Sequence, residues 1–273
     1  MGFVSNLVLA GAKFWAGTLA GSAALVADAF HSLADGAASL AGWIGLTVSR
    51  RPADQGHPYG HRRFDTEASR WVGLSLIVTG VLVGYHALRN PAAATGAGLD
   101  VALGIALASV LGKELLYRIT LRVGRAVKSP AMIASAVDHR SDAIASVAAA
   151  VGIGGRLLGV PALDSIAAVF VSVLILLMGL RVYRAATAEL LDAGASTGQL
   201  AAIRSATEGV DGIVALQDLR ARQHAGKLFV DLKIAVNKDL TVEEGHALAQ
   251  EAKRAVLANV PDIEDVMVHV NPD

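Results

Sequence analysis

Residues 21–35 read GSAALVADAFHSLAD and include three ionisable side chains, Asp28, His31 and Asp35, within one apolar run. That run extends over residues 23–49, and about 20 mostly apolar residues suffice for a helix to cross a bilayer. A charge at the bilayer centre costs roughly 2.5–3.5 kcal/mol on insertion scales, so carboxylates kept there are candidates for function. The stretch therefore indicates a membrane-spanning helix that carries part of a site.

The composition of the whole chain is also that of a membrane protein. Of its 273 residues, 53% are hydrophobic and 18% are charged, whereas a soluble domain carries about 25% charged residues. Six segments are long and apolar enough to span a bilayer, and they are residues 3–20, 23–49, 67–88, 98–121, 131–158 and 162–187. We therefore expect an α-helical membrane domain of six transmembrane helices, whose many small residues allow close helix packing.

Charge divides the chain into two parts. Residues 1–192 hold 16 Lys and Arg against 12 Asp and Glu, whereas residues 193–273 hold 8 against 12. The second part spaces its charges evenly, as soluble domains do, so we place the domain boundary after Asp192. The net charge of zero gives no sign of a nucleic-acid partner, and the lack of cysteine leaves His, Asp and Glu as candidate metal ligands.

Basic residues gather on one side of the predicted helix bundle. They occupy the connections after the second and the fourth span, namely Arg50, Arg51, Arg62 and Arg63, and Arg118, Arg122, Arg125 and Lys128. On the other side only Arg89 and Arg156 lie near span ends. The positive-inside rule then places both connections and both chain termini in the cytoplasm.

The second and fifth spans each carry two ligand-type residues one helical turn apart. Residues i and i+4 share a helix face. The pairs are His31 with Asp35, and Asp138 with Asp142. Two facing pairs supply the four ligands that a tetrahedral divalent site requires. The alternative is that these groups form interhelical hydrogen bonds or ion pairs, for example with Arg140.

The charge of the second span favours a metal cation over ion pairs. No basic residue lies between Lys13 and Arg50, so ion pairing leaves the carboxylates largely uncompensated, and we expect a bound cation to supply the missing charge. Asp28 shares a face with His31 and either orients the imidazole, acts as an additional ligand, or caps and packs the helix. His139 follows Asp138 and lies about 100° around the helix from it. It therefore does not share the face of the pair Asp138 and Asp142, and it is the weaker candidate ligand.

The connection after the second span holds three more ligand-type residues within eight positions. Asp54, His57 and His61 are separated by glycines and a proline, which make the segment a loop. A three-ligand site of nitrogen and oxygen atoms, with one position left for water, is chemically reasonable. The alternative is a solvated turn whose histidines bind no metal.

These motifs together resemble the cation diffusion facilitator family. The resemblance covers essentially the whole chain and rests on the strings GSAALVADAFHSLAD at 21–35, HPYGH at 57–61, KELLYR at 113–118, SPA at 129–131 and HRSD at 139–142. It implies a homodimer of six-span subunits, each with a ferredoxin-like cytoplasmic domain, that exports divalent transition metals in exchange for protons. The expected location is the bacterial inner membrane or a membrane derived from it.

Carried over by position, the resemblance implies two metal sites and one charged pair. The transport site is His31, Asp35, Asp138 and Asp142, the loop site is Asp54, His57 and His61, and the pair that ties the bundle to the dimer interface is Arg63 with Asp192. Many zinc-transporting members carry His where this chain has Asp138, and an Asp there resembles the magnetosome branch linked to iron. Carboxylates suit harder ions, whereas imidazole suits Zn²⁺. We expect Zn²⁺ first, with Fe²⁺ or Mn²⁺ close behind.

Proton coupling follows from the ligand types. Metal binds neutral imidazole and ionised carboxylates, so its binding releases protons. An unperturbed imidazole titrates near neutrality. We therefore expect protons and metal to compete at His31.

The last part of the chain has the pattern of a small α+β domain. We expect helices at 197–209 and 241–258, and strands at 213–221, 228–236 and 264–270. The order of these elements suits a small α+β sandwich, and it matches the ferredoxin-like tail of the family.

The tail keeps only part of the family's metal positions. His246 and His269 match positions that bind metal in many members, whereas the other positions hold Gln217, Lys233 and Asn271. We expect at most a two-residue site, with His224 and Asp231 as local substitutes. The alternative is a dimerisation domain with surface histidines.

The leading hypothesis is therefore a proton-coupled exporter of divalent metal cations. The alternative is a membrane-bound metal sensor or scaffold of the same fold that does not transport. An enzyme is not expected, since the sequence has no nucleophile–base pair and no phosphate-binding glycine loop. The expected partners are divalent metal ions, protons, the lipid bilayer and a second copy of the chain.

Overall fold

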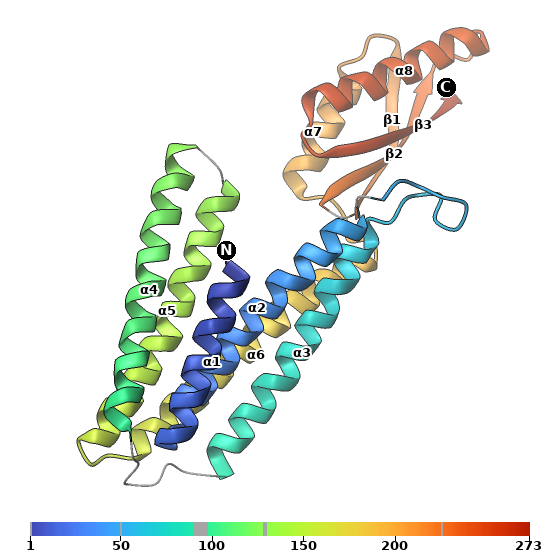
Figure 1. Cartoon of the computed structure of the whole chain (residues 1–273). Helices are drawn as coiled ribbons and strands as arrows, with labels where there is room; N and C mark the ends of the chain where they lie inside the picture. Colours follow the sequence, from blue (N-terminus) through green and yellow to red (C-terminus); the bar gives the residue numbers. More distant parts are fainter. Residues whose placement is uncertain (1, 50, 90–97, 128–129, 225) are drawn as a thin grey trace. The chain divides into compact units, whose positions relative to one another are not determined.

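The computed structural model of the chain describes residues 2–49, 51–89, 98–127, 130–224 and 226–273 (Figure 1). Six long helices come first: α1 (Gly2–Ala20), α2 (Ala23–Ser49), α3 (Arg63–Arg89), α4 (Leu99–Ala126), α5 (Pro130–Leu157) and α6 (Ala162–Leu190). They coincide with the six predicted segments, which confirms the helical order. α3 begins at Arg63, before the predicted segment of residues 67–88, and its first turn contains Asp65 at the positive end of the helix dipole.

Two compact units divide the chain. One comprises Met1–Ile44 and Ala68–Arg184 and holds most of the six helices; the other comprises Gly45–Glu67 and Ala185–Asp273. The second unit thus combines the loop between α2 and α3, and the adjoining helix ends, with the tail of the chain. The boundary expected after Asp192 divides the chain in sequence order and stays a prediction.

Small residues bring two of the helices into close contact. Within the described residues, α3 and α6 are the helices whose length, low charge and mean hydropathy of 1.7 and 2.4 mark them as candidate membrane spans. A Cβ atom on Gly73 would lie 2.6 Å from the backbone nitrogen of Tyr183, and one on Gly179 would lie 2.8 Å from that of Ile77. This approach agrees with the predicted use of small residues in helix packing.

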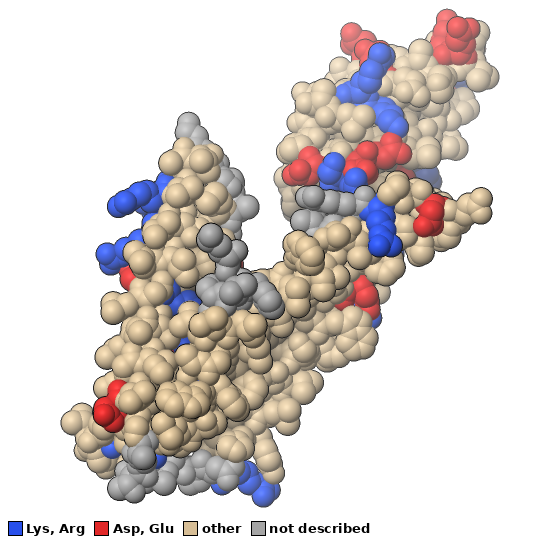
Figure 2. Space-filling view, viewed as in Figure 1, with Lys and Arg blue, Asp and Glu red and all other residues tan. Residues whose placement is uncertain are grey.

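The helical unit buries its polar groups among apolar clusters. One cluster joins α2, α3, α5 and α6, and a second joins α1, α2, α4 and α5. α4 packs along α5, and α1 packs against α4. On the face seen in Figure 2, charged side chains are sparse over the helices and gather at helix ends and on the tail. Some ionisable residues of the spans are nevertheless buried between α1, α2, α4 and α5, namely Lys13, Asp28, His31, Lys113 and Asp142.

The tail forms a three-stranded sheet with two helices. Its elements are α7 (Thr197–Glu208), β1 (Ile213–His224), β2 (Lys227–Val236), α8 (Val242–Asn259) and β3 (Ile263–Pro272). β2 is central, antiparallel to β1 and parallel to β3. Leu228, Val230 and Leu232 of β2 are buried with Ile203 of α7 and Val256 of α8. Both helices begin with a capping box, and the small α+β fold is confirmed.

Candidate metal-binding sites

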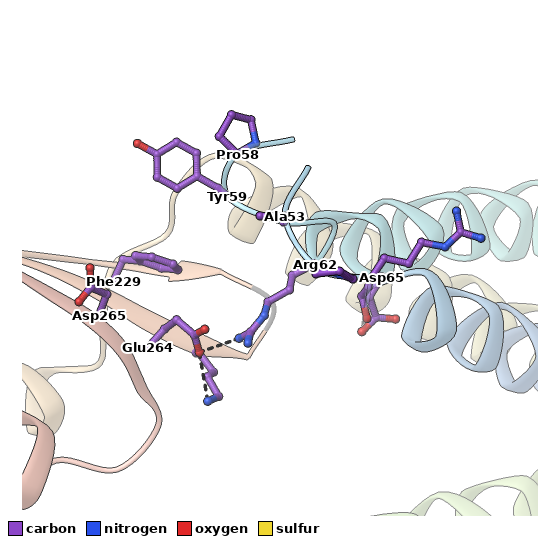
Figure 3. A pocket seen from close by; sticks show the side chains of 13 residues that line it. Ala53, Pro58, Tyr59, Arg62, Asp65, Phe229, Glu264 and Asp265 are labelled. Carbon is purple, nitrogen blue, oxygen red and sulfur yellow. Dashed lines mark hydrogen bonds and ion pairs between the residues drawn. The ribbon is translucent and has the colours of Figure 1, made fainter. Parts of the chain in front are cut away.

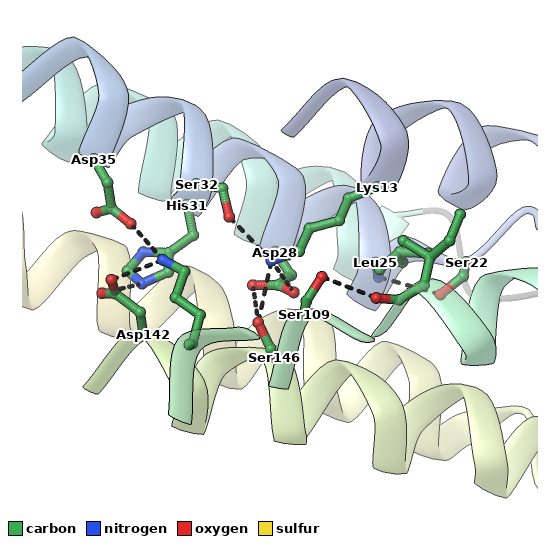
Figure 4. Close-up of polar contacts among 12 residues, drawn as sticks. Lys13, Ser22, Leu25, Asp28, His31, Ser32, Asp35, Ser109, Asp142 and Ser146 are labelled. Atoms are coloured by element: carbon green, nitrogen blue, oxygen red, sulfur yellow. Dashed lines mark hydrogen bonds and ion pairs between the residues drawn. The ribbon is translucent and has the colours of Figure 1, made fainter. Parts of the chain in front are cut away.

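The structure brings His31 and Asp35 of α2 together with Asp142 of α5. One ligand atom of each residue lies within 4.8 Å of the others, and the three side chains meet between the two helices (Figure 4). His31 is 4% exposed, and its Nε2 atom lies 3.5 Å from Asp142 Oδ1. One imidazole and two carboxylates at this spacing are a suitable donor set for a divalent cation.

Local helix geometry explains this arrangement. His31 and Asp35 are one turn apart on α2 and therefore share a face. Ala27 and Ala34 of α2 belong to the same buried cluster as Ala145 of α5. Because these side chains are small, the two helices approach closely enough for the imidazole of α2 to meet the carboxylate of α5.

Asp138, the fourth predicted ligand, lies outside this group. It is one turn before Asp142 on α5, but it is exposed, and it joins no group of three ligand residues among the described residues. Arg140 donates to the Tyr117 hydroxyl at 3.0 Å, and its guanidinium lies 5.0 Å from the ring centroid. The structure thus assembles three of the four predicted ligands, and a role for Asp138 stays a prediction.

A lysine from α4 compensates the charge of this group. Lys113 Nζ lies 2.7 Å from Asp142 Oδ2 and 3.3 Å from Asp35 Oδ2. The residue is 1% exposed. The expectation that the carboxylates lack a compensating protein charge is therefore wrong.

A second lysine compensates Asp28 beside this group (Figure 4). Lys13 Nζ of α1 lies 2.8 Å from Asp28 Oδ2, and both side chains are fully buried. The ammonium also donates to Ser32 at 3.0 Å and to Ser146 at 3.1 Å. Asp28 is therefore the counter-ion of Lys13, a role that its helix face alone did not predict.

Both lysines were missed as partners because they come from other helices than the carboxylates. Each is a basic residue well inside a predicted apolar span. A bilayer tolerates such a charge at a cost, so it is usually paired within the bundle. This is the sequence signal that identifies Lys13 and Lys113 as buried partners.

The loop between α2 and α3 forms a second group. Asp54, His57 and His61 each offer a ligand atom within 4.8 Å of the other two. His57 Nδ1 and His61 Nε2 lie 3.4 Å and 3.3 Å from the Asp54 carboxylate. His61 Nδ1 lies 3.2 Å from the carbonyl oxygen of Pro52. A hydrogen bond from Nδ1 to that carbonyl leaves Nε2 as the ligand atom.

Backbone amides fix the carboxylate of Asp54. Its Oδ1 atom accepts hydrogen bonds from His57 N at 2.7 Å and from Gly56 N at 2.9 Å. The hydrogen bond from the His57 backbone is the main cause that lowers the pKa of Asp54. The carboxylate is therefore ionised at neutral pH, as a metal ligand must be.

Comparison with known sequences decides the family. The family model of the cation efflux transmembrane domain matches residues 1–191, and that of the cytoplasmic domain of cation efflux proteins matches residues 196–273. The chain belongs to the cation diffusion facilitator family. It is therefore an integral membrane protein of a family of metal-ion transporters, which is not a class of enzymes.

Similar proteins come from a plant and from bacteria. "Metal tolerance protein C1" of Arabidopsis thaliana is 34% identical over 288 residues, which cover 100% of this transporter but only 61% of the plant protein. "Manganese efflux system protein MneP" of Bacillus subtilis (strain 168) is 30% identical, with 98% of this chain and 93% of that protein covered. "Magnetosome protein MamB" of Magnetospira sp. (strain QH-2) is 34% identical, with 94% and 88% covered. A solved variant of the MamM C-terminal domain is 28% identical, covers 28% of this chain and 95% of its own, and has a TM-score of 0.27.

Two ion pairs within the second unit of this cation diffusion facilitator connect the start of α3 to Asp192 and to the tail. Arg63 Nη2 lies 2.6 Å from Asp192 Oδ1, as the resemblance implied, and both side chains are about half exposed. Arg62 Nη1 lies 2.7 Å from Glu264 Oε2, which also contacts Lys227 Nζ at 3.1 Å (Figure 3). Although burial raises it, hydrogen bonds from Lys227 and Arg62 lower the pKa of Glu264. The role of the first pair at a dimer interface stays a prediction.

The tail histidines of this family member join no larger group of ligand-type residues among the described residues. His246 on α8 and His269 on β3 are exposed, and neither joins a group of three ligand-type residues in the part of the tail that the structure describes. Lys233 is the register partner of His269 across β2 and β3. Asn271 Nδ2 donates to Gln217 Oε1 at 2.7 Å. Metal binding by the two histidines stays a prediction.

The two proposed substitutes also lie at different positions of the sheet. His224 ends β1 and is buried, and among the described residues its Nδ1 atom has no hydrogen-bond partner. Asp231 is exposed on β2, opposite Arg220. Burial first, and then the positive charges of Arg63 and Arg62, lower the pKa of His224. His224 is therefore a neutral, buried imidazole at neutral pH.

Proposed function

We propose that the chain exports divalent transition-metal cations across the membrane by alternating access, in exchange for protons. The observation that carries this proposal is the group of His31, Asp35 and Asp142, because it holds three ligand atoms within 4.8 Å inside a helical membrane domain. Carboxylates are costly in a bilayer and are kept there for function. We also propose Asp138 as a ligand of the loaded state, since it is one helical turn from Asp142.

The exchange with protons is inferred from the chemistry of the donors. A metal ion binds the neutral imidazole of His31 and the ionised carboxylates of Asp35 and Asp142, so protons must leave when it binds. Protons that bind from the opposite side then favour release of the metal. Flux of metal in one direction is therefore tied to flux of protons in the other.

The donor set favours a harder cation than Zn²⁺. Two carboxylates and one imidazole resemble the oxygen-rich sites that suit Mn²⁺ and Fe²⁺ more than the imidazole-rich or thiolate sites of Zn²⁺. A relative that covers most of this chain is named a manganese efflux protein. We therefore propose Mn²⁺ or Fe²⁺ as the preferred cargo, ahead of the Zn²⁺ expected from the sequence.

The oligomeric state, the membrane orientation and the loop site belong to the same proposal. We propose a homodimer in a bacterial inner membrane or a membrane derived from it, with both termini in the cytoplasm and the tail of residues 193–273 on that side. The match of residues 196–273 to a cytoplasmic domain supports this orientation, as do the basic residues beside the loop. We further propose that Asp54, His57 and His61 bind a second metal ion on the cytoplasmic side.

Transport by the purified full-length chain in lipid vesicles tests this proposal. A metal-sensitive dye and a pH-sensitive dye report both fluxes after Mn²⁺, Fe²⁺ or Zn²⁺ is added outside vesicles that are acidic inside. We expect metal to enter as protons leave, and we expect Asp35→Asn and Asp142→Asn to abolish both fluxes. Asp100→Asn, at an exposed position of α4, is the matched control. Absence of flux for every ion refutes transport, and metal flux without proton flux refutes the exchange.

A non-transporting sensor or scaffold is the alternative, and it predicts metal binding without flux. A sensor needs a ligand group in the domain that recruits partners. Within the described residues of the tail, no three ligand-type residues come together. The alternative therefore has no observation of its own.

A further inference from the structure

Lys113 holds the same two carboxylates that the proposed transport site would use. Its ammonium lies 2.7 Å from Asp142 Oδ2 and 3.3 Å from Asp35 Oδ2. Zinc–carboxylate bonds, for comparison, are about 2.0–2.2 Å long and need lone pairs of the same two carboxylate groups. A divalent ion and the ammonium repel each other and compete for one set of acceptors, so a metal ion cannot fill the site while Lys113 stays in place.

Lys13 shows that a lysine can be buried in this bundle without pairing with the ligand group. Lys13 belongs to a separate network, in which one carboxylate and two serine hydroxyls satisfy its ammonium. Lys113, in contrast, makes its two ion pairs with members of the ligand group itself. One lysine is thus part of the scaffold, and the other lies at the site where the cargo would bind.

We propose that Lys113 is a tethered cation that fills the transport site between metal ions. This inference rests on the proposed function. Metal binds by displacing the ammonium from Asp35 and Asp142, and the returning ammonium helps to expel the metal on the other side. Only the position of the ammonium needs to change. The flexible stem and compact ammonium of lysine suit such a movement.

A tethered cation gives the transporter two properties. The ammonium balances one of the two negative charges of the empty site, so the unloaded protein can change conformation without exposing two bare carboxylates to the bilayer. The affinity for metal is also lower than the ligands alone would give, because each binding event must displace the lysine. Release of the cargo is correspondingly faster.

Two substitutions at this position are expected to shift metal affinity in opposite directions. Lys113→Gln removes the competing charge, and we expect the Kd for Mn²⁺ to fall by roughly tenfold or more. Lys113→Arg keeps the charge on a planar fork that binds carboxylates with two hydrogen bonds, so we expect the Kd to rise by roughly tenfold or more. Arg118→Gln, at an exposed position of the same helix, is the matched control and leaves the Kd unchanged.

Binding is measured on the full-length protein in lipid nanodiscs, by the electron paramagnetic resonance signal of free Mn²⁺. His57→Ala and His61→Ala are present in every variant, so that the loop site does not contribute. An unchanged Kd in both Lys113 variants overturns the proposal. If Lys113→Gln fails to fold, Lys113→Arg decides alone, because an unchanged or lower Kd in that variant contradicts competition.

Asp35→Asn in the same background separates this proposal from the proposed function. If the wild-type ligand group binds Mn²⁺ and Asp35→Asn abolishes binding, the transport site holds. If the Lys113 variants then match the wild type, the tethered-cation proposal alone is refuted. If Asp35→Asn has no effect on binding, the proposed transport site is refuted, and the tethered-cation proposal is refuted as well.

Discussion

The buried pair of Lys13 and Asp28 offers a direct test of how charge is balanced among these helices. The ammonium and the carboxylate are 2.8 Å apart and fully buried. Ser32 and Ser146 accept two further hydrogen bonds from the ammonium, and Ser146 donates to Asp28 Oδ1 at 3.2 Å. Asp28→Asn keeps the shape of this network and removes only its negative charge.

The magnitude of the effect follows from the distance. Two unit charges 2.8 Å apart attract by about 6 kcal/mol at an effective dielectric constant of about 20. The two serines and the new amide recover part of this loss for Lys13. Since breaking a buried pair costs about 3–5 kcal/mol, we expect Asp28→Asn to lower the free energy of unfolding by this amount. Lys13→Met leaves the carboxylate unpaired, and we expect a similar cost.

The double variant distinguishes a buried ion pair from two independent contacts. Lys13→Met with Asp28→Asn removes both charges, and we expect it to be within about 1 kcal/mol of the wild type, as for other buried pairs replaced together. The assay is reversible unfolding of the full-length protein in mixed detergent micelles, followed by tryptophan fluorescence. Asp100→Asn is the control for a carboxylate lost from an exposed position. Single variants that cost less than about 1 kcal/mol, or a double variant whose cost equals the sum of the two, would refute the reasoning.

Three further outcomes are expected. Gly73→Ala places a Cβ atom 2.6 Å from the backbone of α6 and should lower the free energy of unfolding by about 1–3 kcal/mol. Gly42→Ala is the control, because its Cβ atom meets no atom within 4 Å and should leave the stability unchanged. Equal stability of both variants would contradict the close packing of α3 and α6. The pKa of His224 is lowered below its ordinary 6.5, so the unfolded state takes up a proton first, and stability should fall as the pH drops through about 6.5. His224→Gln should therefore reduce the change in melting temperature between about pH 7.5 and about pH 5.5. An unaltered pH profile in this variant would exclude His224 as the cause. His57→Ala should remove one metal ion per chain in equilibrium dialysis, whereas His246→Ala should leave the count unchanged; the reverse pattern would move the second site to the tail.

Features that depend on local spacing could be predicted from the sequence. The apolar runs predicted α2 with its observed bounds of residues 23–49, because burial in a bilayer requires an uninterrupted apolar segment. Asp54, His57 and His61 lie within eight positions of one loop, so few conformations keep them apart. The pairing of His31 with Asp35 followed from the helical period in the same way.

Features that depend on which helices are neighbours could not be predicted in this way. Lys113 reaches Asp35 and Asp142 from α4, and no periodicity within a single span indicates that contact. The i, i+4 rule places Asp138 and Asp142 on one face of α5, but it does not indicate where along α5 that face meets α2. In the structure only Asp142 is buried at the site.

The position of a bound metal ion tests the central claim most directly. Anomalous X-ray scattering from crystals of the full-length chain grown with Mn²⁺ locates each ion without reference to the ligands. We expect a peak between His31, Asp35 and Asp142, with the Lys113 ammonium displaced from both carboxylates. A peak at the loop without one between these three residues would contradict the account.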